Sequence, residues 1–274
     1  RRQRQMCIRD RLTSSLNAKS RGSLAKKIAC GGIDIVIGTH AILTDDIVFN
    51  NIAIVITDEQ HRFGVHQRAR LRNKNENEDT VPHTLVMTAT PIPRTLANTF
   101  HGDMDLSLID EMPKHRKPVT TKVVSQKSLE KVYAFMESEL EKGRQCIVIY
   151  PLIDDSEKLD LGAAVKGFEV LKKRFLDYSV ELMHGRMKRE EKDKIMSHFS
   201  SNKISLLVAT TVIEVGIDIK SATTIIIEHA ERFGLAQLHQ LRGRVGRNDK
   251  ESYCILLHKE NINAVSYTHL RAHE

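Results

Sequence analysis

The sequence contains little that would place the protein in a membrane, in an oxidising compartment or at a zinc centre. No apolar run reaches the length of about 18 residues that a membrane-spanning helix needs. There are 4 cysteines, at positions 7, 30, 146 and 254, and no two of them form a Cys-x-x-Cys pair. Their spacing supports neither a zinc site nor a disulfide framework, and it favours a reducing cytoplasm.

Two glycine motifs that bind phosphate groups are absent as well. No Gly-x-Gly-x-x-Gly follows an apolar strand, which argues against a dinucleotide-dependent oxidoreductase. No Gly-x-x-x-x-Gly-Lys-Ser/Thr occurs in the 274 residues, so the sequence has no Walker A loop to cradle a triphosphate. No internal repeat has the period of a solenoid.

Composition and charge indicate an ordinary globular protein. Hydrophobic residues make up 41% and charged residues 28% of the chain, and 274 residues are enough for two domains. The net charge is +7, but five arginines and one aspartate in residues 1–11 account for +4 of it. The remaining +3 is weak evidence for a nucleic-acid partner.

The two ends of the chain differ from the rest. Residues 1–11, RRQRQMCIRDR, and residues 266–274, SYTHLRAHE, resemble translated sequencing-adaptor sequence. A transit peptide is the alternative for the arginine-rich end, which lacks the apolar core of a signal peptide. We exclude both ends from the fold prediction and expect an internal fragment of a longer protein, native from about residue 12 to residue 265.

Short apolar strands alternate with helical stretches along the rest of the chain. The strands are rich in β-branched residues and nearly continuously apolar, as is typical of strands buried on both faces of a parallel sheet. The predicted strands cover residues 33–37, 52–56, 85–87, 146–150, 206–208, 224–227 and 253–257, and two predicted helices cover 128–142 and 188–199. This alternation predicts an α/β fold built from right-handed βαβ units.

The segment MPKHRKP, residues 112–118, marks a domain boundary. It holds two prolines and four basic side chains without an apolar period, which predicts a linker. The predicted organisation is a first lobe over 12–112, a linker over 113–120, a second lobe over 121–260 and a tail over 261–274. A polar stretch, residues 73–80, is predicted as a surface loop of the first lobe.

Acidic side chains follow one of the predicted strands. In open parallel sheets, ligands bind at the carboxyl ends of the strands. Asp58 and Glu59 come directly after the strand 52–56. Adjacent carboxylates there can divide the work, with Asp58 holding Mg²⁺ through its water shell and Glu59 orienting or deprotonating an attacking water. A solvated acidic turn is the alternative.

Hydroxyl residues follow two other strands of the first lobe. Thr88 and Thr90 come after the strand 85–87, where they can couple two sites by hydrogen bonding or simply form the turn before a helix. Gly38 and Thr39 end the strand 33–37 and suit either backbone contact with a phosphate or a tight turn.

The second lobe carries a sharper pattern. Gly216 permits a close backbone approach, and Asp218 can accept a hydrogen bond from a ribose hydroxyl. Arg244 and Arg247 are predicted to share one face of a helix and suit bidentate contact with a γ-phosphate. A basic helix face that binds nucleic-acid backbone or faces solvent is the alternative for the arginines.

These segments occur in an order that is typical of one family. GTHAIL, DEQHRFG and TATPIPRT are followed by HGRM, ATTVIEVGID and QLHQLRGRVGR. Together they resemble the two-lobed motor of superfamily 2 helicases, and in particular the RecG family of ATP-dependent DNA helicases, over residues 12–257. The bacterial transcription-repair coupling translocase shares several of these strings, but DEQH, VIEVG and IEHAERFG favour RecG.

The resemblance implies a fold, an activity and a set of ligands. The fold is α/β with two RecA-like lobes and mostly parallel sheets, the first lobe truncated because the P-loop strand is missing. The activity is ATP-dependent remodelling of branched double-stranded DNA, such as stalled forks and Holliday junctions, in recombination and repair. The implied cofactors are ATP and Mg²⁺, the implied location is the bacterial cytoplasm, and neither a membrane nor zinc is involved.

The resemblance also assigns roles to individual residues. The catalytic set is Asp58, Glu59, Gln60, His61, Arg244 and Arg247, with Asp58 on Mg²⁺ and the arginines reaching across the cleft between the lobes. The nucleotide-binding set is Thr210, Gly216, Asp218 and Gln240, and Thr88 and Thr90 couple hydrolysis to the grip on DNA. The residues that touch DNA are Thr39, His40, His184 and Arg186.

Departures from the family pattern limit the expected activity. The Walker A loop and the N-terminal wedge domain are missing, and Ser14 stands where the family usually has glycine. We therefore predict that the full-length parent is an ATP-driven helicase whereas this fragment hydrolyses ATP poorly, and that the second lobe is the better-folded half. A catalytically silent α/β module that grips DNA backbone is the alternative function.

Overall fold

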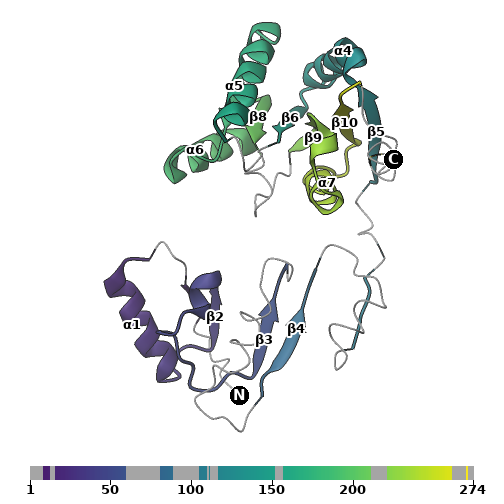
Figure 1. The fold of residues 1–274 in the computed structure, drawn as a ribbon. Helices are drawn as coiled ribbons and strands as arrows, with labels where there is room; N and C mark the ends of the chain where they lie inside the picture. Colours follow the sequence, from purple (N-terminus) through teal and green to yellow (C-terminus); the bar gives the residue numbers. More distant parts are fainter. Residues whose placement is uncertain are drawn as a thin grey trace, which may run out of the picture. The chain divides into compact units, whose positions relative to one another are not determined.

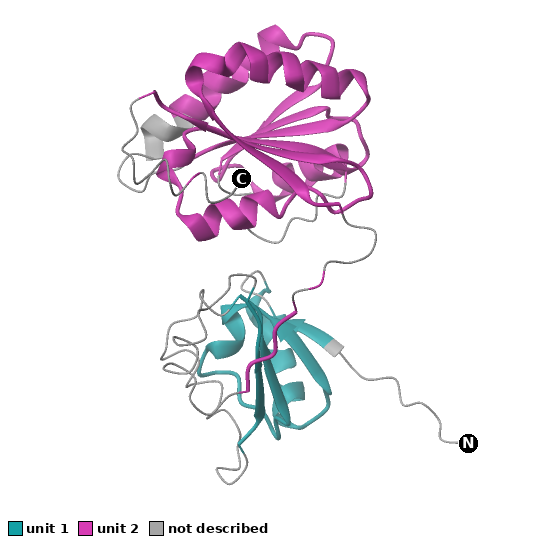
Figure 2. Ribbon diagram, turned by 90° about the vertical axis from the view of Figure 1, so that its right-hand side faces the viewer, with its two compact units in different colours: residues 1–96 teal, residues 97–274 magenta. Residues whose placement is uncertain are grey.

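The computed structural model describes most of the chain, which divides into two compact units. The described residues are 9–12, 16–59, 81–88, 105–109, 111, 117–151, 157–210, 221–260 and 270, with the backbone alone for 157–161. The units are Arg1–Leu96 and Ala97–Glu274 (Figure 2). Among the helices described, none is both long and apolar enough to cross a membrane.

The second unit contains a six-stranded parallel sheet (Figure 1). Its strands are β5 (Val119–Ser125), β6 (Gln145–Tyr150), β7 (Val180–Met183), β8 (Leu206–Thr210), β9 (Ala222–Ile227) and β10 (Ser252–His258). They pair in the order β5-β10-β9-β6-β8-β7, and every neighbouring pair is parallel. The connecting helices are α4 (Leu129–Glu141), α5 (Glu157–Arg174), α6 (Arg189–Ser200) and α7 (Leu235–Arg242), with 3₁₀ turns η3 (Gln126–Ser128) and η6 (Ala230–Arg232). The predicted α/β fold is confirmed.

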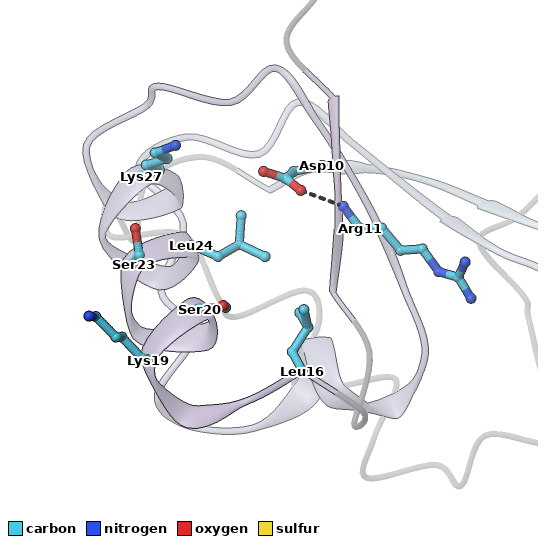
Figure 3. A pocket seen from close by; sticks show the side chains of 8 residues that line it. All are labelled: Asp10, Arg11, Leu16, Lys19, Ser20, Ser23, Leu24 and Lys27. Carbon is cyan, nitrogen blue, oxygen red and sulfur yellow. Dashed lines mark hydrogen bonds between the residues drawn. The ribbon is translucent and has the colours of Figure 1, made fainter. Parts of the chain in front are cut away.

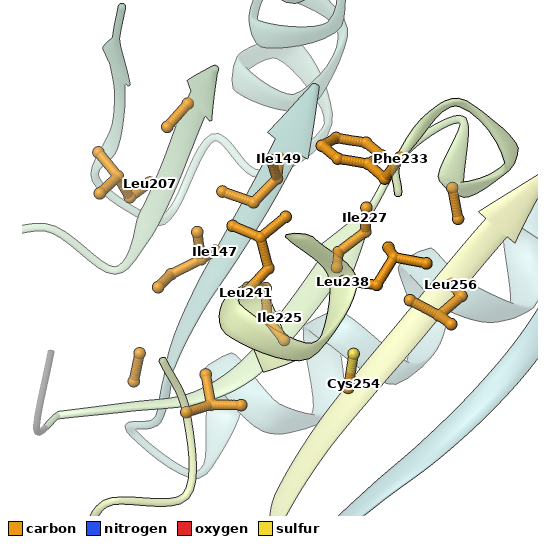
Figure 4. Packing of buried hydrophobic residues seen from close by; sticks show 14 of the residues in the cluster. Ile147, Ile149, Leu207, Ile225, Ile227, Phe233, Leu238, Leu241, Cys254 and Leu256 are labelled. Carbon is orange, nitrogen blue, oxygen red and sulfur yellow. The ribbon is translucent and has the colours of Figure 1, made fainter. Parts of the chain in front are cut away.

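Alternate residues of strand β6 enter two cores on opposite faces of this sheet. Ile147 and Ile149 pack with Leu238 of α7 on one face (Figure 4). Cys146 and Val148 belong to the core that holds residues of α4 and α5. All residues of β6 are buried, and each buried aliphatic side chain stabilises the fold by about 1.5–3 kcal/mol. The prediction of strands buried on both faces is confirmed for this strand.

The first unit contains two parallel strand pairs and one described α-helix. β1 (Arg9–Leu12) pairs with β2 (Ile35–Gly38), and β3 (Ile54–Thr57) pairs with β4 (His83–Val86). The 3₁₀ turn η1 (His40–Leu43) follows β2, and α1 (Ala18–Ala29) begins after Asn17, whose Oδ1 accepts the Ser20 N–H at 2.8 Å. Leu24 and Ile28 of α1 form a small core with Leu12 and Val36 of the β1–β2 pair.

The other face of these first-unit strands is exposed. Val36 points towards α1, so its neighbours Ile35 and Ile37 point the other way, and they are 46% and 59% exposed. Ile56 of β3 lies opposite Leu85 of β4 in the strand register, and these two side chains are 57% and 47% exposed. The expectation that these strands are buried on both faces is therefore wrong, because no described helix covers the second face.

Two predicted boundaries differ from the structure. Residues 9–11 were excluded from the fold prediction as part of a tail, yet they form most of β1 and align with Ile35–Ile37 of β2. Strand β5 begins at Val119, inside the predicted linker over 113–120. The division into units falls after Leu96. The central linker residues 112–116 and the predicted surface loop 73–80 lie outside the described residues.

Candidate functional site

The acidic pair of the first unit lies at the carboxyl end of β3. The strand ends at Thr57, Asp58 is exposed, and Asp58 Oδ1 accepts the Glu59 backbone N–H at 2.9 Å. Glu59 has a left-handed backbone with φ 51°, which few residues other than glycine adopt without strain. This turn places two adjacent carboxylates directly after the end of one strand. The predicted partners Gln60 and His61 lie outside the described residues.

The first unit brings Thr88 to the edge where the acidic pair lies. β3 and β4 are parallel and in register, and the Met87 N–H donates to the Thr57 carbonyl at 2.8 Å. Asp58, Glu59 and Thr88 therefore follow the carboxyl ends of two adjacent strands. Thr90 lies outside the described residues.

Thr39 and His40 follow the end of the other strand pair of this unit. Gly38 ends β2, and a Cβ at this position would collide with the Leu12 carbonyl oxygen and the Ile42 side chain. The Thr39 N–H donates to the Leu12 carbonyl at 3.3 Å, and His40 opens η1. Close packing against the Leu12 carbonyl and the Ile42 side chain thus accounts for the glycine, a reason that the sequence analysis did not foresee.

Several polar residues lie at the carboxyl edge of the second sheet. Thr210 ends β8 and is fully buried, and its strand neighbour in the register is Tyr150, which ends β6. Thr210 Oγ1 has no hydrogen-bond partner among the described residues. His184 follows β7 and Glu228 follows β9 at the same edge. The predicted nucleotide-binding residues Gly216 and Asp218 lie outside the described residues.

The two predicted arginine fingers follow helix α7 and are not on it. The helix ends at Arg242, so the prediction that Arg244 and Arg247 share a helix face is wrong. Val245 is fully buried in the core, and Gly246 has a left-handed backbone with φ 73° at which an added Cβ would lie 2.6 Å from Val119 Cγ2. Arg244 is half-buried, whereas Arg247 is exposed and its Nε donates to the Gly243 carbonyl at 3.1 Å. Gln240, by contrast, is half-buried on α7 itself.

Three titratable residues after β9, Glu228, His229 and Glu231, were not among the predicted site residues. Glu228 is 6% exposed, and burial raises its pKa to about 7, while a hydrogen bond from Gln126 lowers it and the charge of Glu231 raises it. Burial lowers the pKa of His229, whose Nδ1 lies 3.5 Å from Glu231 Oε1 and whose backbone is left-handed at φ 51°. The string IEHAERFG was the signal that could have found them, but it served only to identify the family.

The predicted DNA-contacting turn of the second unit connects β7 to α6. His184 is half-buried and Arg186 is exposed, and the Met187 N–H donates to the His184 carbonyl at 3.2 Å. Lys192 Nζ donates to the Gly185 carbonyl at 2.6 Å. This turn therefore presents an exposed guanidinium from a backbone that is bonded to its own helix.

A separate hollow lies between α1 and β1 of the first unit. Its volume is about 380 Å³, and Figure 3 shows the side chains that line it, among them Arg11, Lys19 and Lys27. The Arg11 N–H donates to Asp10 Oδ1 at 2.9 Å beside it. None of the predicted site residues lines this hollow, so we place no catalytic chemistry there.

The acidic turn has the donor chemistry that a hydrated magnesium ion requires. Mg²⁺ keeps most of its water shell and binds through one or two carboxylates together with substrate phosphates. An exposed Asp58 carboxylate at a strand end, with Glu59 beside it, fits this requirement. No group of three or more histidine, cysteine, aspartate or glutamate side chains in the described part of the chain could hold a metal ion by itself.

Comparison with known families defines the class of protein. Residues 2–99 match the DEAD/DEAH box helicase family, and residues 127–249 match the helicase conserved C-terminal domain. A solved structure of the Mycobacterium smegmatis helicase Lhr bound to ssDNA and AMP-PNP superposes with a TM-score of 0.69 at 18% identity, over 98% of this chain and 37% of that one. The two units thus have the RecA-like α/β fold of helicase lobes.

More similar relatives narrow this class to one family. The ATP-dependent DNA helicase RecG of Bacillus subtilis is 51% identical over 90% of this chain, and that of Thermotoga maritima is 52% identical over 83%. A structure of RecG bound to a three-way DNA junction covers 98% of this chain and 34% of that chain, with a TM-score of 0.71 and 41% identity. The chain belongs to the RecG family. It spans 36% of the Bacillus relative and 29% of the Thermotoga relative.

Proposed function

We propose that this chain is the motor portion of an ATP-dependent helicase that remodels branched double-stranded DNA in the bacterial cytoplasm during recombination and repair. The observation that carries the proposal is the acidic turn after β3, where Asp58 and Glu59 leave the end of a parallel strand beside Thr88. The family supports the proposal, because its named members are ATP-dependent DNA helicases. ATP and Mg²⁺ are the proposed cofactors.

In the proposed hydrolysis of ATP, the first half of the chain contributes acidic groups and the second half contributes basic ones. Asp58 would hold Mg²⁺ through water, and Glu59 would orient the attacking water and take its proton. Arg244 and Arg247 would stabilise the negative charge that develops on the γ-phosphate. Gln60, His61, Thr210, Gly216, Asp218 and Gln240 would contact the nucleotide, Thr88 and Thr90 would couple hydrolysis to DNA, and Thr39, His40, His184 and Arg186 would bind DNA.

We predict that the 274-residue chain releases little phosphate from ATP, with or without forked DNA. The physical reason is the absence of a Gly-x-x-x-x-Gly-Lys-Ser/Thr loop from its sequence, since that loop supplies the backbone donors and the lysine that hold the β- and γ-phosphates. A malachite-green assay of the purified chain measures this. Robust DNA-stimulated release would contradict the prediction.

The role of Glu59 is tested best in a longer relative. In the Bacillus subtilis protein we expect glutamine at the position of Glu59 to lower kcat for ATP by at least about 100-fold, because a general base contributes about that much. Binding of forked DNA should stay within about twofold of wild type, as measured by fluorescence anisotropy. Unchanged ATP turnover would favour the alternative, a catalytically silent module that grips DNA backbone.

A further inference from the structure

Lys192 of α6 lies next to the turn between β7 and α6 and has none of the roles proposed above. Lys192 lies one turn into α6, which begins at Arg189. The first turn of a helix is its positive end, where a cation is unfavourable and an acidic side chain is favoured. Glu190 and Glu191 follow this preference, whereas Arg189, whose Nε lies 3.8 Å from Asp193 Oδ2, and Lys192 do not. Helix stability therefore does not explain this lysine.

The contact that Lys192 makes explains its position. Its Nζ donates to the carbonyl oxygen of Gly185 at 2.6 Å, a short hydrogen bond from a charged donor. Gly185 lies between the two predicted DNA contacts, His184 and Arg186. The ammonium thus holds the backbone of the turn at its centre.

Two further bonds among those described fix the start of α6, and neither of them involves Gly185. Glu191 Oε2 accepts the Lys188 N–H at 3.1 Å, and the Met187 N–H donates to the His184 carbonyl at 3.2 Å. Among the bonds described, Lys192 is the side chain that reaches Gly185. A glycine without a fixed partner is the most mobile element of a turn, so this contact limits the conformations open to Arg186.

We propose that Lys192 is a positioning residue for nucleic-acid binding: it holds the 184–187 turn so that the Arg186 guanidinium meets a backbone phosphate. This inference rests on the proposed function, since it takes Arg186 as a DNA contact. Lys192 itself acts through its hydrogen bond to the Gly185 carbonyl. The proposal is distinct from a general basic surface, in which any lysine of α6 would serve equally.

Lys194 provides a matched control for the charge. It lies on the same helix, is exposed, and makes no hydrogen bond or ion pair among the described residues. The substitutions K192Q and K194Q each remove one positive charge from α6. A long-range electrostatic effect lowers DNA affinity equally in both, whereas a positioning effect appears in K192Q alone.

The test combines forked-DNA binding with hydrogen exchange on the 274-residue chain. We expect K192Q to weaken binding about five- to tenfold beyond K194Q, on the scale of one charged hydrogen bond, and K192R to restore it. In a double-mutant cycle, K192Q should weaken binding far less when Arg186 is already alanine. Amides of residues 184–188 should exchange faster in K192Q than in K194Q, without a change in the melting temperature.

Each outcome separates this inference from the proposed function. Equal binding and exchange in K192Q and K194Q would overturn the positioning role while leaving DNA binding by Arg186 intact. Additive effects of K192Q and R186A would also overturn it. If R186A leaves affinity for forked DNA unchanged, the proposed DNA contact fails, and the inference fails with it.

Discussion

At the scale of single residues, the carboxylate after β9 is the clearest case of an energetic conflict within the fold. Glu228 is buried near Tyr150 and Glu231, and its charge raises the pKa of Tyr150 after the larger effect of burial. Burying a charge without a cation costs free energy, which the side chain avoids by holding its proton to higher pH. The hydrogen bond with Gln126 offsets part of this cost.

We predict that Glu228 makes the fold less stable as pH rises from about 4.5 to about 7. In this window the folded state retains a proton that the unfolded state has lost, so the free energy of unfolding falls with pH and stays low above it. The full effect is on the order of 3 kcal/mol. Urea unfolding at a series of pH values measures it, and E228Q should remove this component.

A variant of His229 distinguishes the effect of Glu228 on stability from that of His229, which has the opposite pH dependence. The lowered pKa of His229 makes stability fall as pH drops below its ordinary value of 6.5, so the two slopes oppose one another. In H229Q the free energy of unfolding should therefore fall more steeply from pH 4.5 to 7 than in wild type. In E228Q it should instead rise with pH over this range. Identical pH profiles for wild type and E228Q would show that the carboxylate titrates alike in both states.

The residues of the candidate site were predictable where motif and strand end coincide. Asp58, Glu59 and Thr88 were expected at carboxyl ends of strands, and the structure has them there. The left-handed backbone of Glu59 and His229 was not predictable, because these residue types give no local signal of the kind that glycine gives. The proximity of Glu228 to Tyr150, a residue 78 positions away in the chain, was likewise not predictable from local sequence.

At the scale of elements, the segment after α7 shows how packing overrides a local pattern. The spacing of Arg244 and Arg247 suits a helix, yet the helix ends at Arg242. Val245 enters the core and Gly246 meets Val119 of β5, so tertiary contacts decide where the chain turns. The two arginines consequently flank the buried residues Val245 and Gly246 in the turn after the helix.

We predict that G246A destabilises the second unit more than G143A does. Both glycines have positive φ, 73° and 69°, so alanine is strained at each by about 1 kcal/mol. At Gly143 a Cβ meets nothing within 4 Å, whereas at Gly246 it lies 2.6 Å from Val119 Cγ2. Urea unfolding should show an additional loss of about 1–3 kcal/mol for G246A. Equal losses would mean that Val119 moves aside freely.

Strands were predictable as elements, but their burial was not. The apolar runs 52–56 and 146–150 look alike in the sequence. Strand β6 has helices on both sides and is fully buried, whereas Ile54 and Ile56 of β3 are more than half exposed. Burial is a property of neighbouring layers, and a strand's own composition does not report whether those layers are present.

At the scale of the whole molecule, the two units differ in how completely they bury their apolar surface. The second has two cores around a six-stranded sheet, while the first has one small core against α1. Exposed isoleucines and a leucine form aliphatic rows on the first-unit strands. Exposed apolar side chains on strands promote association, as do unpaired strand edges.

We predict that the purified chain self-associates through these exposed aliphatic side chains of the first-unit strands. The double variant I37S/I56S should lower the weight-average mass at a given concentration, as measured by sedimentation velocity, because it removes two exposed aliphatic side chains. The control is L176S in the second unit, where an isolated leucine is 81% exposed. A concentration-independent monomer for the wild-type chain would contradict the prediction.

The position of β5 in the second sheet has a consequence for how the protein is made. β5 is the first strand of this sheet to leave the ribosome, and its sole neighbour in the strand order is β10, the last to be synthesised. The ribosome must therefore finish more than 130 residues after β5, up to His258, before that strand finds its partner. Until then β5 has no strand partner, and we expect a chaperone that binds unpaired nascent strands to associate with this chain during translation.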